Sequence, residues 1–190
     1  MDRGIEGGAA KPVYLIGDEG VLFGLDAGEN HLGAVGGNAF GVDVTPVLTV
    51  AATYVANDYV GTNNVAMTFA NCARINGGFG WITRALLVVS IVDIVALELW
   101  LFDTAPTGLG LDSAAFTITD ADALRCVGVI PFQTFYTSAL NAVAGGYMPN
   151  GPMGFQCLPG SRDLYGAFKT NGAPTYAGNV LTPRLMGIQY

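Results

Sequence analysis

The stretch Gly80-Trp-Ile-Thr-Arg-Ala-Leu-Leu-Val-Val-Ser-Ile-Val-Asp-Ile-Val-Ala-Leu-Glu-Leu-Trp-Leu-Phe-Asp103 decides the fold class. It is rich in β-branched residues, which favour strands because their stiff side chains pack well on a pleated surface. A helix of this length would span a bilayer, but Arg84, Asp93 and Glu98 lie inside it. Each of these charges would cost about 2.5–3.5 kcal/mol near the bilayer centre. We therefore expect strands here and no contact with a membrane.

The stretch divides into two predicted strands. In residues 81–93 both alternating faces are largely apolar, which predicts a strand covered on each side. Residues 96–103 alternate more cleanly, with Leu97, Leu99 and Leu101 on one face and Glu98, Trp100 and Phe102 on the other. Two aromatics on an otherwise polar face indicate a subunit contact, so we predict that Trp100 and Phe102 bind a partner. Cover by a neighbouring loop is the alternative.

Further short strand-like runs are separated by Gly, Pro and Asn turns. We expect strands at 45–50, 66–69, 116–119, 125–132, 146–148, 153–158, 164–170 and 181–189. One helical turn is expected over 120–124, capped by Thr119 or Asp120. Roughly eight strands at this spacing predict an all-β domain, a jelly-roll-like β-sandwich over residues 44–190.

Residues 1–43 differ from the rest because glycine recurs throughout and only two short apolar islands interrupt it. Such a segment should not fold alone, since glycine is costly to order and offers little to pack. We interpret it as an extended, Gly-rich N-terminal arm whose islands add as strands to the sheet edge of another chain. A disordered tail is the alternative. The predicted partner-binding residues of the arm are Val13, Tyr14, Leu15, Ile16, Val21, Leu22 and Phe23.

The charge balance argues against nucleic-acid binding. The net charge is −7, and the eight basic residues are scattered, whereas a phosphate backbone needs clustered Lys and Arg. Charged residues make up only 12% of an apolar chain, which fits a protein that covers its surface with partners or with copies of itself. The N-terminus lacks the basic start and apolar run of a signal peptide.

No catalytic or metal-binding pattern accompanies these strands. The single histidine, His31, lies in the Gly-rich arm, so a Ser-His-Asp or Cys-His site is improbable. Cys72, Cys126 and Cys157 lack zinc spacing and are expected to be buried thiols. Residues 33–41 resemble a phosphate loop but lack its Gly-Lys-Ser/Thr ending. We expect no enzyme, no metal and no cofactor.

Two weaker possibilities involve carboxylates. The spacing of Asp112, Asp120 and Asp122 matches no EF-hand loop, and aspartates at turns and helix caps are ordinary. Paired carboxylates, such as Asp93 with Glu98 or Asp103, leave a β-sandwich glycosidase open in principle.

Aromatic residues suggest a sugar-binding surface. The candidates are Trp81, Trp100, Tyr147, Tyr165 and Tyr176. Aromatics in strands more often belong to a core or an interface.

Several ordered segments resemble a group of small virion structural proteins of tailed bacteriophages. The segments are 80–93, 96–107, 112–122, 172–176 and 181–188. The resemblance covers residues 44–190 and leaves the arm outside.

The resemblance implies a capsid-associated role, most like the jelly-roll cement or decoration proteins that bind outside the major capsid shell. Such proteins are commonly trimers, and extended arms often tie them to neighbouring capsomers. The implied partners are the major capsid protein and further copies of this chain. The implied location is the outer surface of the virion capsid, after synthesis in the host cytoplasm. A tail, baseplate or head-fibre component is the first alternative, and a carbohydrate-binding module is the alternative of another class.

Overall fold

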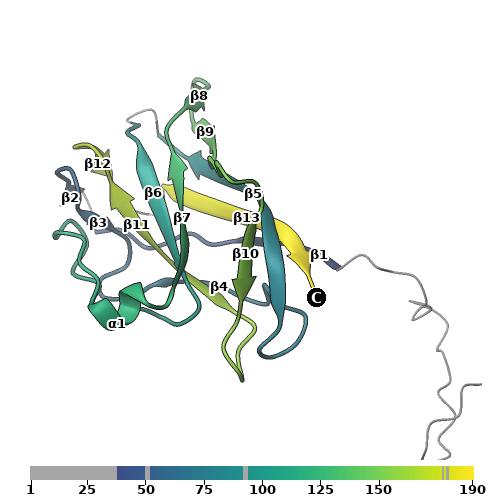
Figure 1. Cartoon of the computed structure of the whole chain (residues 1–190). Coiled ribbons are helices and arrows are strands. Elements are labelled where there is room, and N and C mark those ends of the chain that lie inside the picture. The colour runs from purple at the N-terminus through teal and green to yellow at the C-terminus, as the bar shows by residue number, and fades with distance from the viewer. Residues whose placement is uncertain (1–37, 50–51, 92–93, 177, 179) are drawn as a thin grey trace, which may run out of the picture. The chain divides into compact units, whose positions relative to one another are not determined.

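The computed structural model describes residues 38–49, 52–91, 94–176, 178 and 180–190. These residues form two antiparallel β-sheets with one short helix, which confirms the predicted all-β sandwich (Figure 1). The apolar islands at 13–16 and 21–23, and His31, lie outside the described residues.

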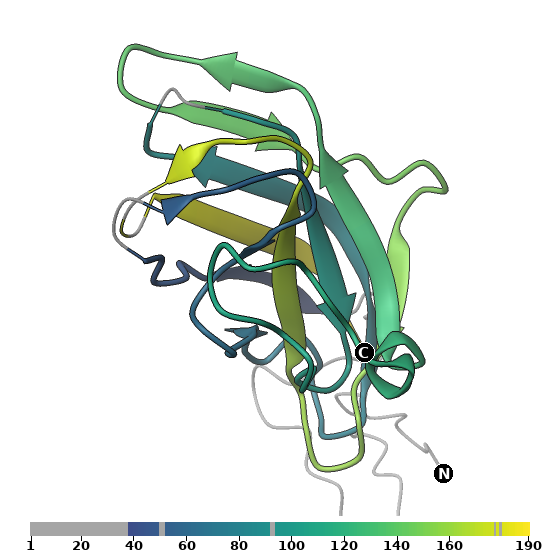
Figure 2. The same cartoon turned by 90° about the vertical axis from the view of Figure 1, so that its left-hand side faces the viewer.

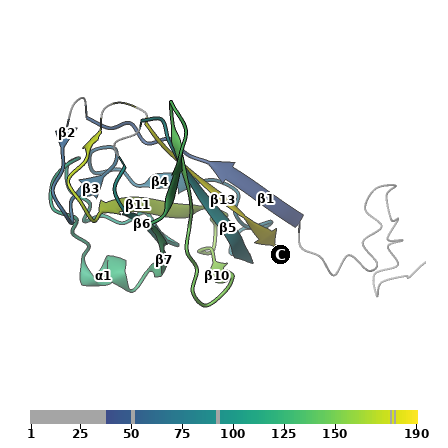
Figure 3. The same cartoon turned by 90° about the horizontal axis from the view of Figure 1, so that it is seen from above.

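The first sheet has six strands in the order β1-β13-β5-β9-β8, with β10 also paired to β5. Its strands are β1 (Asn38–Asp43), β5 (Phe79–Val89), β8 (Phe135–Thr137), β9 (Ala142–Gly145), β10 (Met153–Gln156) and β13 (Leu181–Gln189). Strand β13 covers one edge of β5, while β10 and β9 cover opposite ends of its other edge. Seen from above, β1 lies along β13 at the outside of the sheet (Figure 3).

The second sheet has five strands in the order β3-β11-β6-β7, with β4 also paired to β11. Its strands are β3 (Tyr59–Val60), β4 (Met67–Phe69), β6 (Leu97–Phe102), β7 (Cys126–Phe132) and β11 (Leu164–Thr170). A separate two-stranded pair joins β2 (Ala52–Thr53) to β12 (Thr175–Tyr176). The helix α1 (Asp120–Ala123) precedes β7.

The strand order is that of a jelly roll. The chain passes from β1 to β3 and β4 in the other sheet, then to β5, and then back to β6 and β7. It returns through β9 and β10, crosses to β11 and finishes in β13. The order β1-β13-β5-β9 in one sheet and β3-β11-β6-β7 in the other is that of the double Greek key of jelly rolls.

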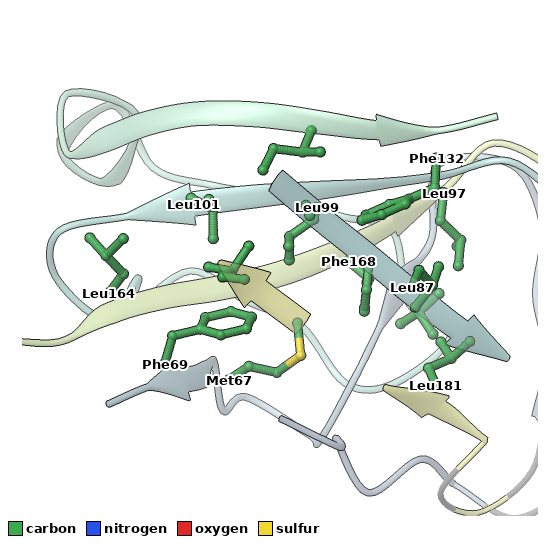
Figure 4. Packing of buried hydrophobic residues seen from close by; sticks show 14 of the residues in the cluster. Met67, Phe69, Leu87, Leu97, Leu99, Leu101, Phe132, Leu164, Phe168 and Leu181 are labelled. Atoms are coloured by element: carbon green, nitrogen blue, oxygen red, sulfur yellow. The ribbon is translucent and has the colours of Figure 1, made fainter. Parts of the chain in front are cut away.

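The core lies between the two sheets because their facing positions are apolar. Leu97 and Leu99 of β6 and Phe168 of β11 are fully buried. Figure 4 shows them on the side of their sheet that faces Leu87 of the crossing strand β5. The clean alternation of residues 96–103 therefore predicted correctly which face of β6 enters the core.

Strand β5 contains a β-bulge that explains its two apolar faces. Arg84 pairs with Met186 but Ile82 pairs with Gly187, so Thr83 is an extra residue on β5. The buried positions consequently change from Ile82 to Ala85, Leu87 and Val89. The outward face is not covered as predicted, since Trp81 is 45% exposed.

Residues 38–43, assigned to the arm by their glycine-rich context, form β1 and belong to the sandwich. Phe40 and Val42 alternate toward the core, and the Phe40 ring meets that of Phe155 edge-on at 6.0 Å. Strand β13, with which β1 pairs, lies more than a hundred residues away along the chain, so the local composition could not reveal this pairing.

The strand predicted at 45–50 is wrong over its described residues 45–49. The backbone N–H groups of Val47 and Thr49 donate to side chains, those of Thr62 and Asp112, and Pro46 has no N–H. The segments 116–119 and 146–148 are not strands either. The remaining predicted strands and the helical turn are confirmed, with shifts of a few residues at their ends.

Replacement of Phe168 by alanine should lower the free energy of unfolding by about 3–5 kcal/mol, because it leaves a cavity between the sheets. Leu140→Ala is the matched control, since Leu140 is 81% exposed and should change stability by less than about 0.5 kcal/mol. Urea unfolding of both variants measures the difference. Equal, small losses would contradict the assignment of Phe168 to the core.

Candidate ligand-binding groove

The outer face of the five-stranded sheet has a covered half and an open half. The connection of residues 103–125 covers the first half with Leu109, Phe116 and Ile118. The open half displays Trp100 of β6 together with Val129 and Pro131 of β7, which are its neighbours on the same face.

Phe102 belongs to the covered half of this face. The prediction that Phe102 binds a partner is wrong, because the folded chain itself covers this side chain. Phe102 is fully buried with Tyr59, Leu109 and Ala167. The pairing of β6 with β7 shifts between Leu101 and Phe102, which are opposite Gly128 and Cys126. The alternative of cover by a neighbouring loop therefore holds for Phe102.

Two buried carboxylates fasten this covering connection. Asp112 accepts hydrogen bonds from Thr49 N at 2.6 Å, from Tyr54 Oη at 2.7 Å and from Gly61 N at 3.2 Å. This contact and burial raise the pKa of Tyr54 well above its usual value, with burial as the larger cause. Asp112 thus ties the connection to the loop positions Thr49, Tyr54 and Gly61.

Asp122 performs the same task at the helix. It accepts from the backbone N–H groups of Thr107 and Gly108 and from the Thr119 hydroxyl at 2.8 Å. Thr119 accepts in return from Asp122 N, which completes the capping box of α1. Burial acts to raise the pKa of Asp122, but these hydrogen bonds outweigh it and hold the pKa below its usual value. Asp112 and Asp122 therefore act as structural acceptors.

The open half forms a groove of about 530 Å³ around Trp100. We call it the Trp100 groove and define it by its lining residues, Glu98, Trp100, Val129, Pro131, Gln133, Tyr147 and Pro149. Trp100 is half-buried because its ring packs against Phe116, with 5.4 Å between ring centroids. Tyr147, by contrast, is 60% exposed. The groove thus brings together a half-buried aromatic ring, that of Trp100, and an exposed one, that of Tyr147.

A polar network fixes the orientation of Trp100. The indole Nε1–H donates to Glu98 Oε2 at 3.1 Å, and Asn171 Nδ2 donates to Glu98 Oε1 at 3.0 Å. Lys169 forms an ion pair with Glu98 at 2.9 Å, and its Nζ lies 6.0 Å from the Trp100 ring centroid. Burial acts to raise the pKa of Glu98, but its hydrogen bonds to Lys169, Asn171 and Trp100 hold the pKa below its usual value. Glu98 is therefore ionised and charge-compensated at neutral pH.

Tyr147 reaches the groove because the chain leaves the six-stranded sheet between β9 and β10. Gly146 N still donates to Ala85 O of β5, but Tyr147 N donates to Pro131 O of β7, in the other sheet. Figure 2 shows β10 beside β7, where this excursion returns. A side chain at position 146 would place its Cβ in overlap with Ile130 Cγ2 and 2.9 Å from Ala85 Cβ. Glycine is therefore required for this close approach.

The structure separates the aromatic residues that suggested a sugar-binding surface. It brings Trp100 and Tyr147 into one groove. Trp81 lies on the other sheet, Tyr165 packs in the covered half, and Tyr176 is fully buried.

Sequence reasoning did not connect Lys169, Asn171, Pro131 and Gln133 with Trp100. The alternation of Glu98 and Trp100 did signal one shared outer face. The pairing of β6 with β7 and β11 places the other residues beside them, and that pairing joins distant parts of the chain.

Neither thiol chemistry nor a metal cluster is evident in the described parts of the chain. Cys72, Cys126 and Cys157 are free, and burial is the main cause that raises the pKa of Cys72 to about 12 and that of Cys157 to about 11. No three His, Cys, Asp or Glu side chains among residues 38–190, apart from the undescribed positions, lie close enough to hold a metal ion. Within the same residues, no helix has the length and hydropathy needed to cross a membrane.

The fold and the groove define an all-β protein of the jelly-roll class with an aromatic surface groove. No protein family, no curated protein and no solved structure matches the chain.

Replacement of Asp122 by asparagine should lower the free energy of unfolding by about 1–3 kcal/mol at pH 7, because several hydrogen bonds to a carboxylate are weakened. A lowered folded pKa contributes stability that is present above the unfolded value, about 3.9 for Asp, and is lost as pH falls through the folded value. The difference from the wild type should therefore shrink toward acidic pH. Urea unfolding across this range measures it.

Asp120→Asn is the matched control, because Asp120 is an exposed carboxylate in the same helical turn. A difference for Asp122→Asn that is small at pH 7, or that grows in acid, would contradict the role given to its carboxylate.

Proposed function

We propose that this protein is a structural protein of a tailed-bacteriophage virion, which binds the outer capsid surface as a cement protein. It would assemble as a homotrimer and clamp neighbouring copies of the major capsid protein. The resemblance of residues 44–190 to such virion proteins supports this proposal. The jelly-roll topology is the fold that the resemblance implies.

One observation about the sandwich carries the proposal, namely the apolar outer face of its six-stranded sheet. Strand pairing places these outward residues next to one another: Trp81, Leu86, Val88, Tyr136, Val143, Met186 and Ile188. Tyr136 is 75% exposed, and no described segment packs over this face. The charges on this face are Arg84, opposite Met186, and the pair of Arg184 with Asp43, whose side chains bond at 2.6 Å. A face of this kind marks an interaction surface.

The mechanism that we propose is thermodynamic. Each copy would contact its own neighbours through the apolar face and capsid subunits through the N-terminal arm. Separation of capsomers under internal pressure would then have to break several contacts together, so the free energies of these contacts add. The net charge of −7 suits a protein at the exterior, because it is not drawn to packaged DNA.

A charged residue on the apolar face should dissociate the trimer. We expect Val88→Asp to reduce the mass measured by light scattering from about three times the 19.7 kDa chain to that of one chain. Val65→Asp is the matched control, because Val65 is 54% exposed but lies away from β5 and its sheet. A monomeric wild type, or equal masses for the two variants, would contradict assembly through this face.

Deletion of residues 2–37 should leave a folded sandwich, because it retains β1, but should reduce occupancy on purified particles. Leu15→Ser with Phe23→Ser is the matched full-length variant, which removes two apolar side chains without shortening the arm. Cryo-electron microscopy of the particles measures occupancy and position. Unchanged occupancy with both variants would refute the clamp. Density at the tail or fibres alone would replace the cement role with one in the attachment apparatus.

A further inference from the structure

The Trp100 groove is one part of a longer depression. It shares Gln133 and Tyr147 with an adjoining hollow of about 310 Å³, and Val129 and Pro149 with another of about 270 Å³. All three follow β7 and the excursion between β9 and β10. Tyr147 lies where the Trp100 groove meets the hollow of about 310 Å³. Because the three hollows adjoin one another, the depression is elongated and can hold a ligand longer than one ring.

The chemistry of the lining selects an uncharged ligand. Glu98 is the only ionisable acid or base along the three hollows besides the phenol of Tyr147, and Lys169 compensates its charge at 2.9 Å. The other lining side chains are aromatic, aliphatic, thioether, amide or hydroxyl groups, all of them uncharged. An anion or cation would find no unpaired countercharge here, so charge complementarity favours a neutral molecule.

The hydrogen-bonding groups that the groove leaves free suit the hydroxyl groups of a sugar. The Trp100 indole N–H is already donated to Glu98, so it does not offer a donor to a peptide carbonyl. Gln133 and Asn150 are exposed, and in the described structure neither amide has a hydrogen-bond partner. An amide both donates and accepts, which matches the hydroxyl groups of a sugar. Aromatic faces complement the apolar C–H face of a sugar ring.

We propose that this elongated groove binds a neutral oligosaccharide, with one sugar ring against Tyr147 and Trp100 beside Gln133, and with hydroxyls of a further ring bonded by Asn150 in the adjoining hollow. The inference is independent of the capsid role, because it rests on the outer face of the other sheet.

Fluorescence titration of the purified full-length chain tests the proposal. The chain has two tryptophans, and Trp81 lies in β5, outside the groove. Trp81→Phe therefore leaves Trp100 as the only indole reporter. The probes are cellohexaose, maltohexaose and chitohexaose, with decaproline as the peptide probe. We expect a saturable change with at least one hexasaccharide at millimolar concentration or below. No saturable change with any of them, or saturation by decaproline alone, would overturn the proposal.

A pair of tyrosine variants locates the site. Tyr147→Ala should weaken binding of the best hexasaccharide by about tenfold or more. Tyr190→Ala should leave it unchanged, because Tyr190 is 41% exposed, stacks on Phe79 of the other sheet and lines none of the three hollows. Both side chains are exposed, so both proteins should fold, which thermal unfolding checks. Equal affinities for the two variants would overturn the assignment to this groove.

A pair of glycine variants tests the excursion itself. Gly146→Ala forces its Cβ against Ile130 and Ala85 and should displace Tyr147 from the groove, with a similar loss of affinity. Gly41→Ala is the matched control, because Gly41 lies in β1, lines none of the three hollows, and has only Met186 Cγ, at 3.8 Å, near a Cβ at that position. Undiminished sugar binding by a folded Gly146→Ala protein would contradict the role of the excursion.

Discussion

The backbone of β5 is the constraint on which the rest of the structure depends, because both edges of this long strand need hydrogen-bond partners. β13 supplies them along one edge, but β10 and β9 supply them only at the two ends of the other. Between β9 and β10 the chain leaves the sheet, and the Tyr147 backbone bonds to Pro131 of β7 instead. The same break that interrupts the sheet therefore builds one wall of the Trp100 groove.

The two outer faces of the sandwich differ in how far other segments cover them. The proposed contact between copies and the proposed sugar binding therefore lie on different sheets. On the five-stranded sheet, the connection of residues 103–125 covers Phe102 and leaves Trp100 at the border of an open groove. On the six-stranded sheet, the apolar outer face carries no cover from the described residues. A copy that used the second face for assembly would keep the groove on the first face accessible. The proposed self-assembly and the proposed sugar binding therefore use different faces.

The carboxylates illustrate why residue type alone does not define a site. Asp112 and Asp122 belong to the spacing that could suggest a cation, yet each accepts hydrogen bonds from backbone N–H groups and a hydroxyl. Glu98 is likewise satisfied, by Lys169, Asn171 and Trp100. These groups hold the covering connection and orient the indole. The chemistry left for a ligand at the groove therefore resides in the aromatic rings and in the amides of Gln133 and Asn150.

The sequence by itself determined the all-β class, the long strands β5, β6, β7, β11 and β13, and the cap of α1. Alternation and capping are local, so a few neighbouring residues suffice to specify them. Only the tertiary structure decided that residues 38–43 pair with β13, that Phe102 is buried while Trp100 borders a groove, and that Tyr147 crosses to β7. Each of these depends on contacts between segments far apart in the chain, or on a bulge that shifts the faces of a strand, and neither leaves a local pattern.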